Sequence, residues 1–142
     1  MLDKIYIINL DKRTDRWEHV EKNVIPFLPY PEKIQRFSAV DHTHYNTSSR
    51  RAAGCTYSHL KIWQESIDLG YSSILVIEDD LVWIRPKEFI AELLETLCEV
   101  KANLCNLAYF NKSGLGHTSH PHLFRCTNVQ TTGCYFANVN FL

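Results

Sequence analysis

The sequence has little that would assign it to a functional class by composition alone. It carries 15 Lys and Arg against 16 Asp and Glu, a formal net charge of −1, so no excess charge draws it to nucleic acid or to an anionic membrane. The apolar run in the N-terminal segment MLDKIYIINL is too short, and its flanks too acidic, for a signal peptide or a membrane span. We therefore predict a cytoplasmic protein with no nucleic-acid partner and no membrane span.

Cysteine is present, but not in patterns that build disulfides or closed metal sites. The five cysteines are odd in number and form no C-x-x-C pair, which favours reduced thiols in a reducing compartment. The run HTSHPHLFRC, from His117 to Cys126, holds residue types that bind zinc, but its spacing matches no closed zinc motif. A Gly-rich phosphate loop and a G-x-S-x-G nucleophile turn are both absent. The chemistry must therefore be sought in other residues.

What the sequence does contain is an alternation of strand-like and helix-like segments. Its 142 residues suit one domain, over 1–142. We expect strands over 4–10, 33–40, 74–77, 103–110 and 131–139, helices over 11–28, 52–70 and 87–100, and loops over 41–51 and 111–122. This order predicts an α/β sandwich with a mainly parallel central sheet, in which ligands bind outside the carboxyl ends of the strands.

Three adjacent acids follow the most apolar strand. The run Ile74 to Ile77 is typical of a strand covered on both faces, and Glu78, Asp79 and Asp80 come directly after it. If strand geometry continues, Glu78 and Asp80 point to one side and Asp79 to the other. The acids then either form a solvated exit turn or share a divalent cation such as Mg²⁺ or Mn²⁺, whose shell substrate phosphates would complete.

Two arginines follow the first strand in NLDKRTDRW. Arg13 and Arg16 lie at an expected helix start, where free backbone N–H groups also attract an anion. Asp11 and Asp15 could cap that helix or bind ribose hydroxyls. The alternative is a solvated, charged first turn without a ligand.

The segment AAGCTYSHLKIW is unusual for a helix. Gly54 lowers helix stability, which suggests a helix start or a close backbone approach. Ser58 and His59 follow one turn later, either as a buried hydrogen-bonded pair or as functional groups, and Trp63 is expected in the core.

Together, five ordered segments resemble glycosyltransferase family 25, the group of lipopolysaccharide-biosynthesis glycosyltransferases and procollagen galactosyltransferases. They are IYIINLDKRTDRW, FSAVDH, GCTYSHLKIW, ILVIEDDLVW and TTGCYFAN. The resemblance implies a GT-A-like, Rossmann-like three-layer fold and transfer of a hexose, galactose or glucose, from a UDP-sugar with inversion. It also implies dependence on Mn²⁺ (or Mg²⁺) and a glycan acceptor or a hydroxylysine-type acceptor in a protein.

The same resemblance implies roles for individual residues. Asp80 would bind the metal together with Glu78, and Glu78 or Asp79 would face the ribose and a metal-bound water. The residues that match the family's donor-side motifs are Asn9, Leu10, Asp11, Arg13, Arg16, Asp41, Gly54, Cys55, Ser58 and His59. The catalytic base stays unassigned, with Asp79 and His59 as candidates.

Two departures from the family pattern shape the expected activity. His42 follows Asp41 where the family usually has Gly, and family domains usually continue beyond TTGCYFAN, whereas this chain stops at Leu142 after a strand and the first residues of an expected helix. We therefore expect a truncated domain that keeps the donor half of the site, transfers little or no sugar alone, and could self-associate into a homo-oligomer. The other hypotheses are a degenerate transferase that binds UDP-sugar without turnover and a metal-dependent phosphoryl-transfer enzyme.

Overall fold

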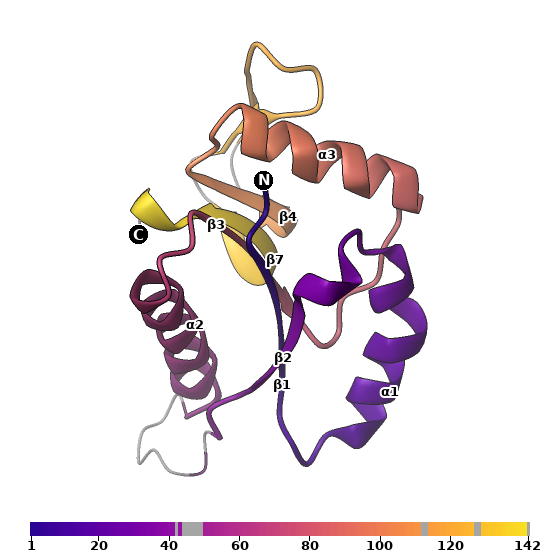
Figure 1. The fold of residues 1–142 in the computed structure, drawn as a ribbon, viewed down its shortest axis with the longest axis vertical. Helices are drawn as coiled ribbons and strands as arrows, with labels where there is room; N and C mark the ends of the chain where they lie inside the picture. The colour runs from indigo at the N-terminus through magenta and orange to yellow at the C-terminus, as the bar shows by residue number, and fades with distance from the viewer. Residues whose placement is uncertain (42, 44–49, 112–113, 127–128, 142) are drawn as a thin grey trace.

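A five-stranded sheet covered by helices on both faces forms the body of the protein (Figure 1). The computed structural model describes residues 1–141 except 42, 44–49, 112–113 and 127–128. The sheet comprises β1 (Lys4–Asn9), β2 (Ile34–Ser38), β3 (Ser73–Glu78), β4 (Leu104–Asn111) and β7 (Val129–Asn138). The helices are α1 (Thr14–Asn23), α2 (Arg50–Asp68) and α3 (Lys87–Glu99).

The strand order β2-β1-β3-β7-β4 makes the sheet mostly parallel. β1 pairs in parallel with both β2 and β3, whereas β7 runs antiparallel between β3 and β4. β4 therefore points the same way as β3, and only β7 is reversed. This confirms the predicted α/β sandwich with a mainly parallel sheet.

The two faces of the sheet carry separate apolar clusters, as alternation along the strands requires. Ile5, Ile7, Leu75 and Ile77 face α1 and α3, whereas the intervening side chains pack with α2. Figure 1 shows the resulting three layers, with α2 on one side of the sheet and α1 on the other. Ile74 to Ile77 are fully buried, which confirms β3 as a strand covered on both faces.

The start of α3 and the end of α2 lie where their sequence signals predict, whereas α1 is shorter than expected. α3 follows Pro86 and buries Ile90, Leu94 and Leu97 on one stripe. Gly70 ends α2 with φ of 70°, a left-handed conformation that favours glycine. The first expected helix, over 11–28, is shorter than predicted, because it begins at Thr14 and gives way to a 3₁₀ turn at Ile25–Phe27.

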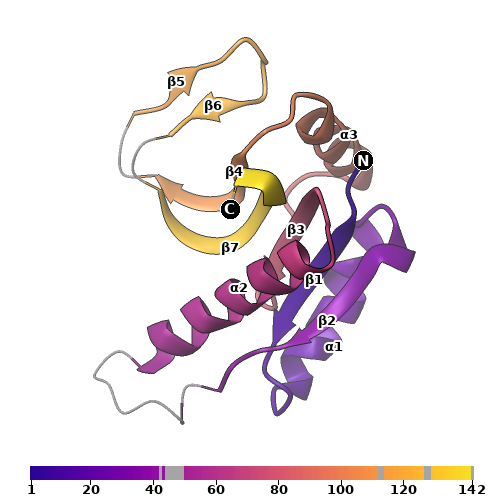
Figure 2. The ribbon, with the colours of Figure 1, turned by 60° about the vertical axis from the view of Figure 1, so that its left-hand side comes forward.

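Two further expectations need correction, and a third concerns a loop that the structure describes only in part. The loop expected over 111–122 contains a short strand, β5 (Gly116–His117), which pairs with β6 (Phe124–Arg125) in a hairpin beyond β4 and β7 (Figure 2). The helix expected after β7 is a 3₁₀ turn, Val139–Phe141. Most of the loop expected over 41–51, including His42, lies outside the described residues.

No helix among the described residues is both long enough and apolar enough to cross a bilayer. All five cysteines are free thiols.

Candidate functional site

The carboxyl ends of β2, β1 and β3 lie side by side at one edge of the sheet. The register pairs Asn9 of β1 with Ser38 of β2, and Ile8 with Glu78 of β3. The acids after β3 and the segment NLDKRTDR after β1 therefore meet at this edge, as predicted. We call it the polar edge.

The three acids at the end of β3 do not share one face. Glu78, the last residue of the strand, faces α2, where its carboxylate lies 3.5 Å from His59 Nε2. Asp79 faces α1 and binds Arg16. Asp80 lies in the turn after the strand and also approaches Arg16, at 3.6 Å.

The expectation that Glu78 and Asp80 point to the same side is therefore wrong, because β3 ends at Glu78 and its alternation stops there. The opposite placement of Glu78 and Asp79 is as expected.

Asp79 is the centre of a buried hydrogen-bond group with Asn9 and Arg16, which we call the Asp79 hub. Its Oδ1 accepts from Arg16 at 2.6 Å and its Oδ2 accepts from the Asn9 amide at 2.7 Å. Asp79 is 7% exposed and Asn9 1% exposed. Because donors hold both oxygens of Asp79, the carboxylate is fixed as an anchor for Arg16.

Asn9 links the hub to two neighbouring elements. Its amide donates to the Arg13 carbonyl at 3.2 Å, and its Oδ1 accepts from Arg36 of β2 at 2.6 Å. The Arg36 guanidinium also lies over the Trp17 ring, 4.6 Å from its centroid. A cation over a ring and a charged hydrogen bond together fix this residue beside the hub.

The first turn of α1 is charged, and its charges pair locally. Arg13 holds Asp15 through two hydrogen bonds of 2.9 and 2.7 Å, which lower the pKa of that carboxyl to about 2. Asp11 accepts from Ser38 at 2.8 Å. The N-cap residue is Arg13, whose side chain makes no capping hydrogen bond, so neither Asp11 nor Asp15 is the N-cap. Asp15 instead lies in the first turn, where its carboxylate accepts from backbone N–H groups.

Leu10 and Asp41 complete the segments predicted to border a nucleotide. The Leu10 carbonyl accepts from Arg13 N at 2.8 Å in the turn that leads into α1. Asp41 pairs with Lys12 at 2.7 Å and accepts from the Thr43 backbone, contacts that hold the pKa of Asp41 well below its usual range. The donor-binding roles of these residues stay predictions.

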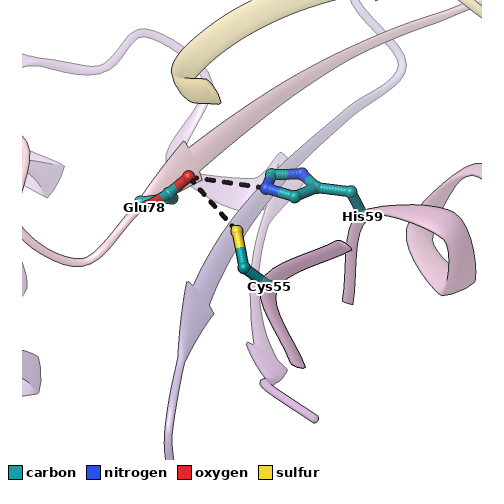
Figure 3. Close-up of side chains that lie close together, drawn as sticks. All are labelled: Cys55, His59 and Glu78. Atoms are coloured by element: carbon teal, nitrogen blue, oxygen red, sulfur yellow. Dashed lines mark hydrogen bonds and ion pairs between the residues drawn. The ribbon is translucent and has the colours of Figure 1, made fainter. Parts of the chain in front are cut away.

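A second group lies on the α2 side of the polar edge and consists of Cys55, His59 and Glu78, which we call the Cys55 cluster (Figure 3). One ligand-type atom from each of the three lies within 4.8 Å of the others. Burial lowers the pKa of His59, but the neighbouring Cys55 and Glu78 outweigh it and raise this pKa to about 9. Among the described residues, this is the one group of three such side chains close enough to share a metal ion.

His59 is held by β7 as well as by α2. Its Nδ1 lies 2.9 Å from the Tyr135 hydroxyl, which also accepts from Trp63 Nε1 at 2.8 Å. Burial raises the pKa of Tyr135 well above its ordinary value, so the phenol stays neutral. Trp63 packs against the apolar cluster on this face, as expected.

Ser58 is a structural link between α2 and the chain after β2. It is 1% exposed, donates to the Gly54 carbonyl at 2.8 Å and accepts from Val40 N at 2.9 Å. Gly54 lies inside α2 and is buried, so its interpretation as a helix start is wrong. The buried, hydrogen-bonded alternative for Ser58 is confirmed.

Sequence reasoning missed Arg36 and Tyr135. Arg36 belongs to β2, and alternation along that strand places it on the α1 face with Asn9, but nothing in its local sequence indicates an ionic role. Tyr135 lies on β7, and its contact with His59 follows from the antiparallel pairing of β7 with β3. That pairing has no local sequence signal.

A cavity lined mainly by apolar side chains lies beside α3, and no residue of either group lines it. Its volume is about 960 Å³, and its lining includes Trp83, Phe89 and Leu107. Leu81, directly after the acids, lines one side of it. The polar edge is therefore the place where charged chemistry gathers, and the cavity is a separate feature.

Comparisons with known proteins identify the family. The family glycosyltransferase family 25 (LPS biosynthesis protein) matches residues 2–125. The chain belongs to glycosyltransferase family 25. The match includes β1, β2 and β3, whose ends form the polar edge, and the neighbouring helices α1 and α2.

Curated relatives support the same family. The chain is 32% identical over 121 residues to procollagen galactosyltransferase 1 of Danio rerio, covering 68% of this chain and 19% of that protein. It is 24% identical over 143 residues to a glycosyltransferase 25 family member of Drosophila pseudoobscura pseudoobscura, covering 84% and 22% respectively.

A third relative is a procollagen lysyl hydroxylase and glycosyltransferase of Acanthamoeba polyphaga mimivirus, 26% identical over 183 residues, covering 100% of this chain and 20% of that protein. The chain thus spans about a fifth of the length of these relatives.

Proposed function

We propose that the protein binds a UDP-hexose at the polar edge and transfers the hexose, galactose or glucose, to a glycan acceptor or a hydroxylysine-type acceptor in a protein, with inversion. The observation that carries the proposal is the Asp79 hub at the carboxyl ends of β1 and β3, with the exposed Asp80 beside it, in a chain of this family. The position suits a nucleotide in an open parallel sheet. A GT-A type arrangement of the donor is part of the proposal.

The residues of the hub would orient the donor. Arg16 is 38% exposed although Asp79 holds it, so its guanidinium has further N–H groups that can meet a diphosphate. Asn9 and Asp79 fix its position, and Arg36 fixes Asn9 in turn. Arg16 is thus preorganised, so the ordering cost of binding an anion is reduced.

The side chains present fit a hard divalent cation at Asp80. Mn²⁺ and Mg²⁺ prefer oxygen ligands and often use one or two carboxylates with substrate phosphates. The Asp80 side chain is 60% exposed at the edge of the hub, and its nearest ionic contact is the 3.6 Å approach to Arg16. Asp80 would hold the ion. Glu78, which the family resemblance names as the second acid, lies beside His59 on the α2 side of the strand end and is left out of this proposed ion site. A bound ion would supply charge neutralisation on the departing diphosphate.

The two candidate bases have unequal surroundings. Donors already hold both Asp79 oxygens, so its better supported role is to position Arg16. His59 is 6% exposed and lies against Glu78 and Tyr135. The assignment of either as the base remains a prediction, and a base supplied elsewhere in a longer protein is compatible with the proposal.

The test measures UDP binding by calorimetry in chelator and in Mn²⁺. We expect binding in Mn²⁺ to be at least tenfold tighter than in chelator, and Asp80→Asn to remove the difference. Glu92→Gln, an exposed acid on α3, is the matched control and should keep it. Equal affinity of the unaltered protein in both buffers would contradict the proposed donor site.

A turnover assay separates transfer from binding alone. UDP-galactose and UDP-glucose are supplied with Mn²⁺ and a hydroxylysine-containing peptide or a lipopolysaccharide core glycan, and released UDP and sugar-modified acceptor are both measured. Transfer supports the full proposal. Metal-dependent UDP binding without transfer supports the hypothesis of a binding protein without turnover.

A further inference from the structure

His59 carries a buried ring nitrogen that lacks a hydrogen bond. His59 Nε2 is buried, and among the described residues it has no hydrogen-bond partner. Buried polar side-chain atoms are nearly always satisfied, so such an atom calls for an explanation. Figure 3 shows the ring edge directed at the Glu78 carboxylate and the Cys55 thiol.

The contacts within the Cys55 cluster are long, and their lengths approach the separation of ligands around a bound ion. His59 Nε2 lies 3.5 Å from Glu78 Oε1, and Cys55 Sγ lies 3.9 Å from the same oxygen. In a tetrahedral zinc site with bonds of about 2.0 to 2.3 Å, ligand atoms stand roughly 3.3 to 3.6 Å apart. These two distances lie within a few tenths of an ångström of those in a loaded site, and all three ligand atoms lie within 4.8 Å of one another.

The surroundings of His59 match those of a metal-binding imidazole. A histidine that binds metal through one nitrogen almost always hydrogen-bonds through the other, which fixes the ring. Here Nδ1 lies 2.9 Å from the Tyr135 hydroxyl, and Trp63 holds that hydroxyl in place. The ring is therefore oriented with Nε2 towards Cys55 and Glu78.

The ligand types select the class of cation. Thiolate and imidazole favour zinc and similar transition metals, whereas Mg²⁺ and Mn²⁺ favour oxygen ligands. Cys55 is exposed and the Glu78 side chain is 29% exposed, so an ion can enter from solvent.

We propose that Cys55 Sγ, His59 Nε2 and a Glu78 oxygen bind a thiophilic divalent cation, with Zn²⁺ as the best match. The three ligands leave a fourth position for water or another group. Binding needs the Cys55 thiolate and an unprotonated His59 Nε2, so the protons on these two atoms are released to solvent. The site stands independently of the proposed donor site and differs from it in metal preference.

The test uses Co²⁺ as a spectroscopic substitute for Zn²⁺ on the reduced, metal-free protein. One equivalent of Co²⁺ should produce a thiolate-to-cobalt charge-transfer band in the near ultraviolet and tetrahedral d–d bands in the visible, and Zn²⁺ should displace both. Absence of these bands at one equivalent would overturn the proposal.

Variants identify the ligands. Cys55→Ser should remove the charge-transfer band, whereas Cys126→Ser, a control thiol near the β5–β6 hairpin, should keep it. A band that persists in Cys55→Ser, or is lost in Cys126→Ser, would show that other thiols bind the ion.

The variant His59→Asn tests whether the His59 imidazole binds the ion. It keeps an amide near Tyr135 but removes Nε2, and circular dichroism verifies that it folds. Because loss of an outer-shell partner alone weakens metal binding about 10- to 100-fold, loss of this ligand should weaken Co²⁺ binding at least tenfold. Glu78→Gln, at a partly exposed position, provides the same comparison if His59→Asn does not fold. Unchanged Co²⁺ affinity in the folded variant would overturn the assignment.

Discussion

Asp79 is the residue in which buried charge and surface chemistry meet. Its carboxylate satisfies a buried amide, Asn9, on one side and the partly exposed Arg16 on the other. Removing this carboxylate should lower the stability of the fold, because Asn9 and Arg16 would lose their acceptor. Asp80, the next residue, has 60% of its side chain exposed, so its removal should affect stability little.

We expect Asp79→Asn to lower the free energy of unfolding by about 1.5–3 kcal/mol, the range for hydrogen bonds to a charged group. The introduced amide can accept through only one atom, so Asn9 or Arg16 loses its partner. Asp80→Asn should change stability by about 0.5 kcal/mol or less, as for exposed sites. Urea denaturation of the two variants measures the difference, and equal losses would contradict the hub.

The ion pair between Arg13 and Asp15 should make the stability of the protein depend on pH in the acid range. The Asp15 pKa is lowered from 3.8 to about 2 by the Arg13 hydrogen bonds. A lowered pKa in the folded state contributes stability that is present above the unfolded value, near 4, and is lost as pH falls towards 2. NMR titration of the carboxyl carbon should show the Asp15 pKa rising towards its ordinary value in Arg13→Gln. Lys22→Gln, at the other end of α1, should leave it unchanged.

At the scale of elements, the end of α2 shows how one residue sets a boundary. Gly70 N–H donates to the Ile67 carbonyl and Tyr71 N–H to the Ser66 carbonyl, both at 3.0 Å. This is the Schellman arrangement, which places Gly70 in the left-handed region. The cap turns the chain from α2 into β3 and so fixes where the strand that carries Glu78 begins.

Gly70→Ala should cost about 1–2 kcal/mol, since a Cβ in the left-handed region meets the following carbonyl. Gly133 of β7 is a matched control, because its φ lies outside that region and a Cβ there would meet Ala108 at an ordinary 3.8 Å. Gly133→Ala should be neutral or raise stability by up to about 1 kcal/mol. Thermal melts of both variants test the cap, and similar losses would show that backbone strain is not the cause.

Elements whose signals are local could be predicted from the sequence. The apolar run of β3, the apolar stripe of α3 and the glycine after α2 each identified their element, and the positions of Asn9 and Asp79 at strand ends followed from a parallel sheet. The predictions that failed concern features set by contacts between distant elements or by the path of the chain after a strand ends. Alternation could not predict that Asp80 would join Asp79 beside Arg16, because the chain turns after Glu78.

At the scale of the whole molecule, the polar edge carries two separate chemistries on opposite faces of one strand end. Asp79 and the exposed Asp80 meet Arg16 from α1, and Glu78 meets His59 from α2. The first group suits hard cations and phosphates, and the second suits softer metals. Because strand alternation separates Glu78 from Asp79, the two responses to metal should be separable by mutation.

We expect Asp80→Asn to lose the Mn²⁺ dependence of UDP binding while keeping the cobalt charge-transfer band. Cys55→Ser should do the reverse. Calorimetry with UDP and absorption spectroscopy with Co²⁺, performed on the same preparations, measure both responses. Loss of both responses in either single variant would show that the two faces form one site.

The reversed strand β7 also has a consequence for the order in which the protein can assemble during synthesis. β4 pairs with β7 and not with β3, and of the five strands of this sheet β7 is the last to leave the ribosome. Until Val129–Asn138 has emerged, β3 has no partner on one side and β4 has none within the five-stranded sheet. An apolar strand edge left open during translation is a template for pairing with other chains. We infer that a nascent chain stalled before Val129 is the form most prone to aggregate and the form on which a ribosome-associated chaperone would act.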